Sequence, residues 1–422
     1  MSSTIRDEVD VLVAGGGTAG AVAAIQAARA GAVTALVEMT GQLGGTITNG
    51  GVSAPAHFFT RHGQVIGGIG WELVHQAREF EGQPFPDYQN PPPHRPQRHV
   101  GVNPRLYVLL TEETVLRAGV ALHYHEVVTA AEDLGERWRV TTVGKGIRRE
   151  ILCREIIDCT GDADLVGLLG FERIGAEVRQ PGTLTFRLDG YDPANLDEAL
   201  IEQRYQQAMA AGELQPGDFY ETTEPFIVFL QRRGANQQHI FNADSSTAVT
   251  QTEANLAGRA SLLRLLRFVR TLPGCEGVKL AMLCGATAVR ETWRIAGETT
   301  ISREDYLAGR NYPDAIGYTF YFIDVHHERG IEREFLADGV VPTLPLGALI
   351  PRGSRRLLVA GRTISSDRLA HSALRVEASC MAMGQGAGAA AALGVRLGCA
   401  SRDVPHQQLR ALLLDHGAIL PA

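Results

Sequence analysis

The chain has 422 residues, of which 45% are hydrophobic and 21% charged, the balance of an ordinary globular protein. Its net charge of −7 argues against a nucleic-acid surface, because phosphate binding needs a basic stripe. The six cysteines, at 153, 159, 275, 284, 380 and 399, show no CxxC spacing and no neighbouring His cluster. We therefore expect no metal site and no disulfide, but buried thiols in a reducing cytoplasm.

Neither the N-terminus nor the longest uncharged run gives a sign of export or membrane insertion. Residues 1–10 are charged and lack the apolar core of a signal peptide. The longest uncharged run, 378–395, is rich in Gly and Ala and too weakly hydrophobic for a membrane span. We expect a cytoplasmic protein with no membrane partner. At about 100–200 residues per domain, two domains are expected.

The N-terminal region predicts a strand, a helix and a second strand in close succession. Residues 9–14 are apolar and β-branched and end at glycine, which is typical of a buried strand. Residues 19–30 are rich in Ala and are followed by Gly31, which is typical of a helix with a glycine C-cap. Residues 33–38 predict a second buried strand. Together they indicate a right-handed βαβ unit and a parallel sheet.

The rest of the chain predicts further elements in order. Residues 39–100 begin with Gly-rich turns and continue into a Pro-rich stretch, 84–96, which is expected to form a surface loop. A mixed pattern from about 170 to 344 indicates a separate α+β domain inserted into the first. Helices are predicted at 104–118, 196–211, 252–271 and about 373–397, and strands at 121–130, 138–143, 150–160, 183–188, 226–230, 318–325 and 357–360.

The first turn of the βαβ unit carries the G-x-G-x-x-G pattern between Gly15 and Gly20. A strand precedes it, a helix follows, and Glu38 ends the second strand, which is the full context of a dinucleotide site. Gly15 permits the tight turn, Gly17 lets the backbone approach a diphosphate, and Gly20 lets the helix pack on the strand. The phosphates would meet free amides at the helix N-terminus, and Glu38 would accept hydrogen bonds from the adenosine ribose.

The βαβ unit alone does not separate FAD from NAD. Three further features favour FAD: the glycine pair Gly44-Gly45, the strand that ends in Thr160-Gly161-Asp162, and the strand that ends in Gly361-Arg362. No second G-x-G-x-x-G follows a strand, so a nicotinamide domain is not expected. The absence of CxxC disfavours the two-dinucleotide disulfide reductases.

At these motifs the chain resembles a known family, the FAD-dependent oxidoreductases of the glutathione-reductase type. The resemblance covers nearly the whole chain and rests on DVLVAGGGTAGAVAA, GQLGG, IIDCTGDADL, RETWRIAGETTISREDYLAGRNYPDAI, IDVHH, LLVAGR and SALRVEASCMAMGQGAGAAAA. It implies FAD as cofactor, with the last long helix pointing its N-terminus at the flavin pyrimidine. The residues expected to contact FAD are Gly15, Gly17, Thr18, Ala19, Gly20, Glu38, Met39, Gly44, Gly45, Thr46, Val127, Thr160, Gly161, Asp162, Gly361, Arg362, Arg375 and Val376.

Histidines are the first candidates for chemistry, because oxidising a C–OH group needs a base for the hydroxyl proton. His326 closes the predicted strand 318–325, and Asp324 faces the same side, where it would orient the imidazole or raise its pKa. A purely structural pair explains the spacing equally well. His57 follows the Gly44-Gly45 loop and is a second candidate, as base, substrate ligand or flavin tether; an exposed loop histidine is the alternative.

Arginines are the second candidates. Arg290 and Arg294 are one turn apart in a segment expected to be helical, where they would hold a carboxylate or sugar hydroxyls, or form an interdomain salt-bridge network. Arg375, near the start of the last helix, is expected to touch flavin or substrate and to stabilise the reduced flavin. Three glycines on that helix, at 384, 386 and 388, are expected to allow tight packing on the first helix without ligand contact.

The sequence thus predicts an α/β protein with a Rossmann-like FAD-binding domain of the glutathione-reductase type and an inserted α+β substrate domain. The FAD domain would use 1–60, 100–170 and 345–422, and the cap 61–99 and 171–344. The expected reaction is hydride transfer from a secondary alcohol of a sugar, polyol or hydroxy acid to FAD. The alternatives are a fumarate-reductase-like C=C reductase and a non-catalytic FAD-binding scaffold; a tRNA-modifying role is not expected, since the chain leaves no room for a further helical domain after residue 422. A small-molecule substrate and an unidentified electron acceptor or donor are the expected partners, no metal is expected, and a homo-oligomer is left open.

Overall fold

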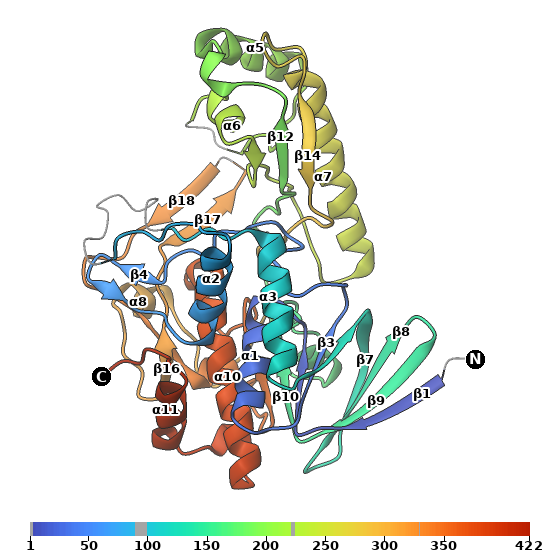
Figure 1. Cartoon of the computed structure of the whole chain (residues 1–422), viewed down its shortest axis with the longest axis vertical. Coiled ribbons are helices and arrows are strands. Elements are labelled where there is room, and N and C mark those ends of the chain that lie inside the picture. Colours follow the sequence, from blue (N-terminus) through green and yellow to red (C-terminus); the bar gives the residue numbers. More distant parts are fainter. Residues whose placement is uncertain (1–2, 89–98, 221–223, 329) are drawn as a thin grey trace.

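The computed structural model describes residues 3–88, 99–220, 224–328 and 330–422 (Figure 1). Its centre is a five-stranded parallel sheet in the order β20-β10-β2-β3-β6. The strands are β2 (Val11–Ala14), β3 (Thr34–Glu38), β6 (Ala121–Tyr124), β10 (Glu155–Asp158) and β20 (Leu357–Val359). Helix α1 (Thr18–Arg29) connects β2 to β3, so the predicted βαβ unit and parallel sheet are confirmed.

Two helices pack closely on one face of this sheet. Helix α10 (Glu377–Leu397) lies against α1 along much of its length (Figure 1). A Cβ atom at Gly384 would lie 2.2 Å from the backbone oxygen of Ala19, and one at Gly388 would lie 2.4 Å from that of Ala23. Only glycine therefore permits this approach, as predicted. Gly386 faces away from α1, against Ile316.

A second sheet, in the order β1-β9-β8-β7, stands beside the first. It consists of β1 (Ser3–Glu8), β7 (Glu126–Asp133), β8 (Trp138–Gly144) and β9 (Ile147–Cys153). The sequence did not predict β1, because its alternating charges hide the pattern of an edge strand. The predicted strands 121–130 and 150–160 are each two strands, one in each sheet. The first break falls at His125, whose φ is +60°, and the second at Arg154, whose amide bonds to the Asp10 carbonyl.

A separate lobe, the cap lobe, is formed by residues 184–283 and stands at the top of Figure 1. Its buried side chains, from Leu184 to Val278, form their own hydrophobic cluster. It contains α5 (Glu198–Ala211), α6 (Ile227–Gln231), α7 (Ala248–Val269), β12 (Phe186–Asp189), β13 (Gly234–Ala235) and β14 (Lys279–Leu283). The prediction of a strand at 226–230 was wrong: this run is α6, since a short apolar run that is buried on nearly all sides carries no period that separates helix from strand.

The remaining elements surround the sheet and the base of the cap lobe. The predicted strand 318–325 is two strands, β16 and β17, and the predicted helix 373–397 is preceded by a short separate helix, α9. The full set of remaining helices and strands is β4 (Phe59–Thr60), β5 (Gly63–Gln64), α2 (Ile69–Phe80), α3 (Pro104–Arg117), α4 (Asp164–Leu168), β11 (Arg173–Gly175), β15 (Trp293–Ile295), α8 (Arg303–Leu307), β16 (Ala315–Tyr318), β17 (Ile323–His327), β18 (Gly330–Glu334), β19 (Thr343–Pro345), α9 (Arg368–Leu374) and α11 (His406–Asp415).

The remaining expectations concern the Pro-rich stretch, the cysteines, membrane insertion and the domain boundaries. The Pro-rich stretch 84–96 extends beyond residue 88 into a segment outside the described residues. All six cysteines are free thiols, and five of them are buried, as expected. Among the described residues, no helix has the length and apolar character needed to cross a membrane. The domain boundaries stay a prediction.

One buried carboxyl lies at the amino end of the parallel sheet, far from the glycine turn at the other end of the strands. The Glu155 side chain is fully buried, and its Oε1 accepts hydrogen bonds from Arg356 at 3.3 Å and from the Ser401 amide at 3.1 Å. Its Oε2 has no partner among the described residues. Burial raises the pKa of Glu155 to about 8, against the opposing effect of Ser401 and Arg356.

Candidate cofactor and active site

The glycine turn between β2 and α1 has the geometry of a diphosphate site. Gly15 has φ of +95°, and a Cβ atom there would lie 2.4 Å from the Cys159 carbonyl oxygen. A Cβ atom at Gly20 would lie 1.8 Å from the Gly15 oxygen, so both positions require glycine. The amides of Gly17 and Thr18, at the N-terminus of α1, have no hydrogen-bond partner among the described residues. They are therefore available to an anion.

The second glycine pair closes over this turn. The Gly44 amide donates to the Gly16 carbonyl at 2.9 Å, and both Gly44 and Gly45 have positive φ. A Cβ atom at Gly17 would meet nothing closer than the Gly45 Cα, at 3.9 Å. The open space in front of Gly17 fits the role predicted for it, close approach of the backbone to a ligand. The residues present therefore fit the diphosphate of FAD.

Glu38 ends β3 and holds the turn from the other side. One carboxylate oxygen accepts from the Gly16 amide and the other from the Thr40 amide, each at 2.7 Å. The side chain is only 7% exposed. Each carboxylate oxygen has two acceptor sites, so capacity remains for the hydroxyl groups of a ribose. The structure thus gives Glu38 a second task, anchoring the loop, that the sequence did not predict.

The two other predicted cofactor segments are tied to each other and to the base of the cap lobe. Arg362, after β20, donates to the Gly161 carbonyl at 2.5 Å and to Asp162 Oδ1 at 2.6 Å. The same guanidinium donates to the Ser245 hydroxyl at 2.8 Å and to the Val289 carbonyl at 2.5 Å. Its side chain is therefore largely engaged by protein partners, and Gly361, with φ of +105°, is the position in that turn whose conformation favours glycine.

The other predicted cofactor residues lie around the same edge of the sheet. Met39 directly follows β3 and is 66% exposed. Val127 lies at the start of β7 and is 48% exposed. Val376 is the N-cap of α10, directly after Arg375. The Ala378 amide in the first turn of that helix donates to the Pro55 carbonyl at 3.0 Å. The loop that follows Gly44-Gly45 thus reaches the N-terminus of α10, as expected for a flavin site.

A buried chain of polar side chains lies at the junction with the cap lobe. His326 Nε2 is 3.1 Å from Asp324 Oδ2, and His326 Nδ1 is 2.8 Å from Nε2 of His239. Because an ionised carboxylate only accepts, the proton of neutral His326 belongs on Nε2, and its Nδ1 accepts from His239. The prediction that Asp324 and His326 share a face is confirmed. His326 lies within β17 and not after a strand.

Both imidazoles are neutral bases. Burial, and then the positive charge of Arg290, lower the pKa of His326 to about 3 and that of His239 to about 2. Asp324 opposes this shift for His326. The same contacts, chiefly with His326, lower the pKa of Asp324 below its usual range. At neutral pH the chain is therefore a carboxylate followed by two neutral rings.

Two arginines lie beside this chain. Arg375 donates to Gln180 Oε1 and to the Asp324 carbonyl, each at 3.3 Å, and its Nη2 is 4.0 Å from Asp324 Oδ2. Arg290 donates to the Pro181 carbonyl at 2.5 Å. Burial and the nearby charge of Arg375 lower the pKa of Arg290 to about 10. The structure thus brings Arg290, Arg375 and His326, three of the predicted catalytic residues, into one cluster.

One part of the arginine prediction was wrong. The segment from Arg290 to Arg294 is not helical: it is extended and enters β15, which pairs with β11. In an extended chain the two arginines do not share a helical face, and Arg294 lies near Glu291 and Arg368 instead. A spacing of four residues is compatible with a helix, but here the pairing of this segment with a neighbouring strand decides its conformation.

The fourth predicted residue, His57, is fully buried and not an exposed loop histidine. Its ring centroid is 5.7 Å from that of Tyr321, whose electrostatic effect reaches Arg290, and 4.4 Å from that of His99. It therefore adjoins the cluster through an aromatic neighbour.

Sequence reasoning missed three residues of the cluster. His239 comes from the cap lobe, Tyr220 stacks on it with ring centroids 4.9 Å apart, and Gln180 accepts from both Arg375 and the His326 amide. They lie far along the chain from His326 and belong to no motif. No local signal identifies them.

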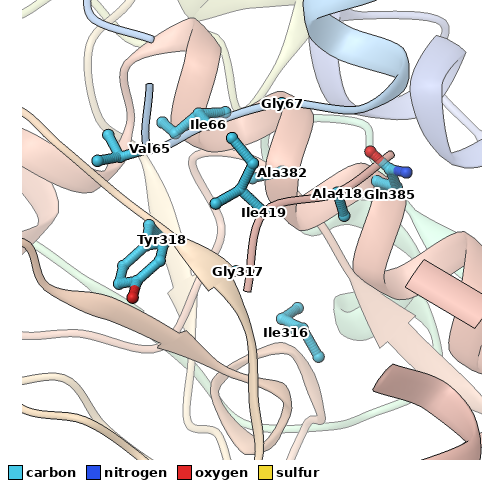
Figure 2. Close-up of a pocket in the computed structure, with 10 residues that line it drawn as sticks. All are labelled: Val65, Ile66, Gly67, Ile316, Gly317, Tyr318, Ala382, Gln385, Ala418 and Ile419. Carbon is cyan, nitrogen blue, oxygen red and sulfur yellow. The ribbon is translucent and has the colours of Figure 1, made fainter. Parts of the chain in front are cut away.

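A small cavity elsewhere is not the cofactor site. It lies between β16 and α10, on the face of α10 turned away from α1, and Figure 2 shows Ala382 and Gln385 in its wall. Its volume of about 10 Å³ admits roughly one water molecule. Gln385 is occupied there as a structural residue, since it accepts from the Ile69 amide and donates to the His416 carbonyl, each at 3.1 Å.

Comparison with known proteins identifies the family. A family model described as FAD dependent oxidoreductase matches residues 10–413. The chain belongs to this family. It is therefore an FAD-dependent oxidoreductase, an enzyme whose cofactor is FAD, as the sequence predicted.

Solved structures resemble this FAD-dependent oxidoreductase only distantly, and no curated protein matches it. AlpK is 14% identical over 92% of this chain and 62% of its own, with a TM-score of 0.46. A geranylgeranyl bacteriochlorophyll reductase-like protein of Thermoplasma acidophilum is 12% identical over 97% and 84%, with a TM-score of 0.46. The anhydrotetracycline hydroxylase OxyS of Streptomyces rimosus is 13% identical over 97% and 66%, with a TM-score of 0.43. The chain thus spans less than two thirds of AlpK and of OxyS, and none of these likenesses bears on its substrate.

Proposed function

We propose that this oxidoreductase removes a hydride from a hydroxyl-bearing carbon of a small molecule and passes it to FAD. The observation that carries the proposal is the hydrogen-bonded chain Asp324–His326–His239 beside Arg290 and Arg375. Alcohol oxidation needs an unprotonated base for the hydroxyl proton, and both imidazoles are unprotonated at neutral pH, although their lowered pKa makes them weak bases in the free site. FAD, when bound, accepts the hydride.

The cofactor residues are part of the proposal. The turn at Gly15–Gly20 would hold the diphosphate on its free amides, and Glu38 would hold the adenosine ribose. The segments Thr160–Asp162 and Gly361-Arg362 and the N-terminus of α10 would flank the remainder of the cofactor. Met39, Thr46 and Val127 would border its adenosine half.

The two histidines act as a unit. Asp324 holds the Nε2 proton of His326 and so fixes its tautomer, which turns Nδ1 toward His239. Both His326 nitrogens are engaged, so a substrate hydroxyl reaches the pair through His239 or takes the place of His239 on His326 Nδ1. If His326 takes the hydroxyl proton, the Asp324 carboxylate directly stabilises the imidazolium that forms. If His239 takes it, His239 can pass its Nε2 proton to Nδ1 of His326, so that the imidazolium again lies beside Asp324. His57 would lie at the opposite side of the substrate, beyond Tyr321.

A test is anaerobic bleaching of the flavin absorbance by a panel of sugars, polyols and hydroxy acids. The native enzyme should be bleached by at least one alcohol, and His326→Asn should slow that step by about 10²–10⁴-fold with FAD content unchanged. His62→Asn, an exposed histidine, is the matched control. Bleaching by no alcohol would sink the proposal.

One observation supports a second candidate, reduction of a C=C bond with an arginine as the acid. The lowered pKa of Arg290, about 10, makes it a better proton donor than an ordinary guanidinium. Bleaching by NADH alone, with reoxidation by an enoate, would favour this reductase. Bleaching by no donor at all would leave a non-catalytic FAD-binding protein.

A further inference from the structure

The cluster at the cap junction carries more positive than negative charge. Arg290 and Arg375 come from separate segments. The charge of Arg375 lowers the pKa of Arg290, and both arginines lower the pKa of His326. Arg290 is 9% exposed, and its guanidinium donates to a neutral backbone carbonyl, that of Pro181. Arg375 donates only to neutral oxygens within hydrogen-bond distance, and its Nε is buried without a partner among the described residues.

The anions within reach do not balance these two cations. Asp324 is the nearest, but His326 engages its Oδ2, and a third arginine, Arg333, faces its Oδ1 at 3.9 Å. Glu377 lies in the first turn of α10, and burial raises its pKa to about 7, so it is only partly ionised at neutral pH. The two buried guanidiniums thus share Asp324 with Arg333, and Glu377 is only partly ionised, so the cluster keeps an excess of positive charge, which is costly unless another anion completes the site.

We propose that Arg290 and Arg375 bind a carboxylate group of the substrate, so that the substrate is a hydroxy acid or a sugar acid. The inference rests on the proposed function and names its substrate class. A carboxylate offsets this excess of positive charge. Guanidinium groups favour a planar carboxylate through paired hydrogen bonds.

The same arrangement adjusts the base. Arg290 is the largest electrostatic cause of the lowered pKa of both His326 and His239. A carboxylate between Arg290 and Arg375 offsets that positive charge, so the histidine pair becomes more basic when an acidic substrate is present. A neutral alcohol would leave the pair weakly basic. The site therefore favours oxidation of a hydroxyl group in a molecule that also carries a carboxylate.

The test measures binding separately from turnover. The FAD-loaded enzyme is titrated with pyruvate, which has no hydroxyl to oxidise, with its neutral amide, and with inorganic phosphate, by calorimetry and by flavin absorbance. Pyruvate should bind at least about tenfold more tightly than the amide, because the amide lacks the charge that the guanidiniums recognise. Arg290→Gln should weaken pyruvate binding by about tenfold or more, and Arg290→Lys by less.

Arg355→Gln is the matched control, since it removes a positive charge from a side chain that is 70% exposed and paired with Asp403, and it should leave pyruvate binding within about twofold. FAD content and melting temperature report whether each variant folds. Equal binding of acid and amide, or no pyruvate binding by the native enzyme, overturns the inference. So does tighter binding of phosphate, or an Arg290→Gln enzyme that shifts the flavin potential while binding pyruvate normally.

The two proposals fail differently. If pyruvate binding depends on Arg290 but no hydroxy acid bleaches the flavin, the carboxylate site stands and the alcohol oxidation falls. If neutral polyols bleach the flavin and acids neither bleach it nor bind, the oxidation stands and the carboxylate site falls.

Discussion

Replacement of Glu38 tests the cofactor site most directly, because this carboxylate holds both the loop and, we propose, the ribose. Its two oxygens accept from the Gly16 and Thr40 amides at 2.7 Å. Hydrogen bonds to a charged group contribute roughly 1.5–3 kcal/mol each. In Glu38→Ala these two bonds are lost from the free and the FAD-bound protein alike, whereas two bonds to the ribose hydroxyls are lost from the FAD-bound protein alone. A loss of about 3 kcal/mol or more in FAD binding corresponds to at least about a hundredfold rise in Kd.

Glu38→Gln separates the carboxylate from the shape of the side chain. A glutamine has one acceptor oxygen, so its NH₂ group would face one of the two backbone amides, donor against donor. FAD affinity should therefore fall in the order native, Glu38→Gln, Glu38→Ala, measured by fluorescence titration of the flavin-free protein. Glu72→Gln, in a half-exposed ion pair with Arg29, serves as the control and should bind FAD normally. Unchanged FAD affinity in Glu38→Ala would refute the assignment of Glu38.

Three other changes address stability and the histidine chain. Because the pKa of Glu155 is raised to about 8, its contribution to the free energy of unfolding should be fully present below about pH 4.5 and fall as the pH rises to about 8. The free energy of unfolding should fall by at most roughly 1.4 kcal/mol per pH unit, and urea titrations of Glu155→Gln should show a flatter pH profile. Gly388→Ala pushes a Cβ against an α1 carbonyl oxygen and should cost about 1–3 kcal/mol, unlike Gly285→Ala, whose Cβ meets nothing within 4 Å; equal melting temperatures would contradict this. Asp324→Asn frees His326 to take the wrong tautomer and should slow flavin reduction by about 10²-fold or more at unchanged FAD content. A native rate in that variant would exclude the carboxylate from the mechanism.

The sequence predicted the βαβ unit and its glycine turn well, because their signals are local. Gly15, Gly20 and Glu38 lie within one short βαβ unit, and each is required by a contact with a neighbour in that unit or in the adjacent strand. Gly384 and Gly388 of α10 were predictable for the same reason, since helix packing needs small residues at a fixed spacing, whereas Gly386 packs against Ile316 and not against α1 as predicted. Where the physics is decided within one turn or one helix face, sequence reasoning is sufficient.

The other half could be predicted only in part, because its partners are distant along the chain. Asp324 and His326 share a strand face, so their pairing was predictable, but His239 reaches them from the cap lobe. The spacing of Arg290 and Arg294 misled, since strand pairing, which the sequence does not display, decides the conformation there. Tertiary contacts, and not local propensity, build this part of the site.

The hydrogen bond between His239 and His326 links the two halves of the molecule. His239 belongs to the cap lobe and is stacked on Tyr220, whereas His326 is fixed by Asp324 in β17. A neutral imidazole pair holds this 2.8 Å contact only while the cap lobe keeps its position, so movement of the cap lobe would uncover Nδ1 of His326. Access of a substrate to Nδ1 of His326 would therefore depend on the position of the cap lobe. The charge of Arg290 lowers the pKa of both rings that meet at this contact.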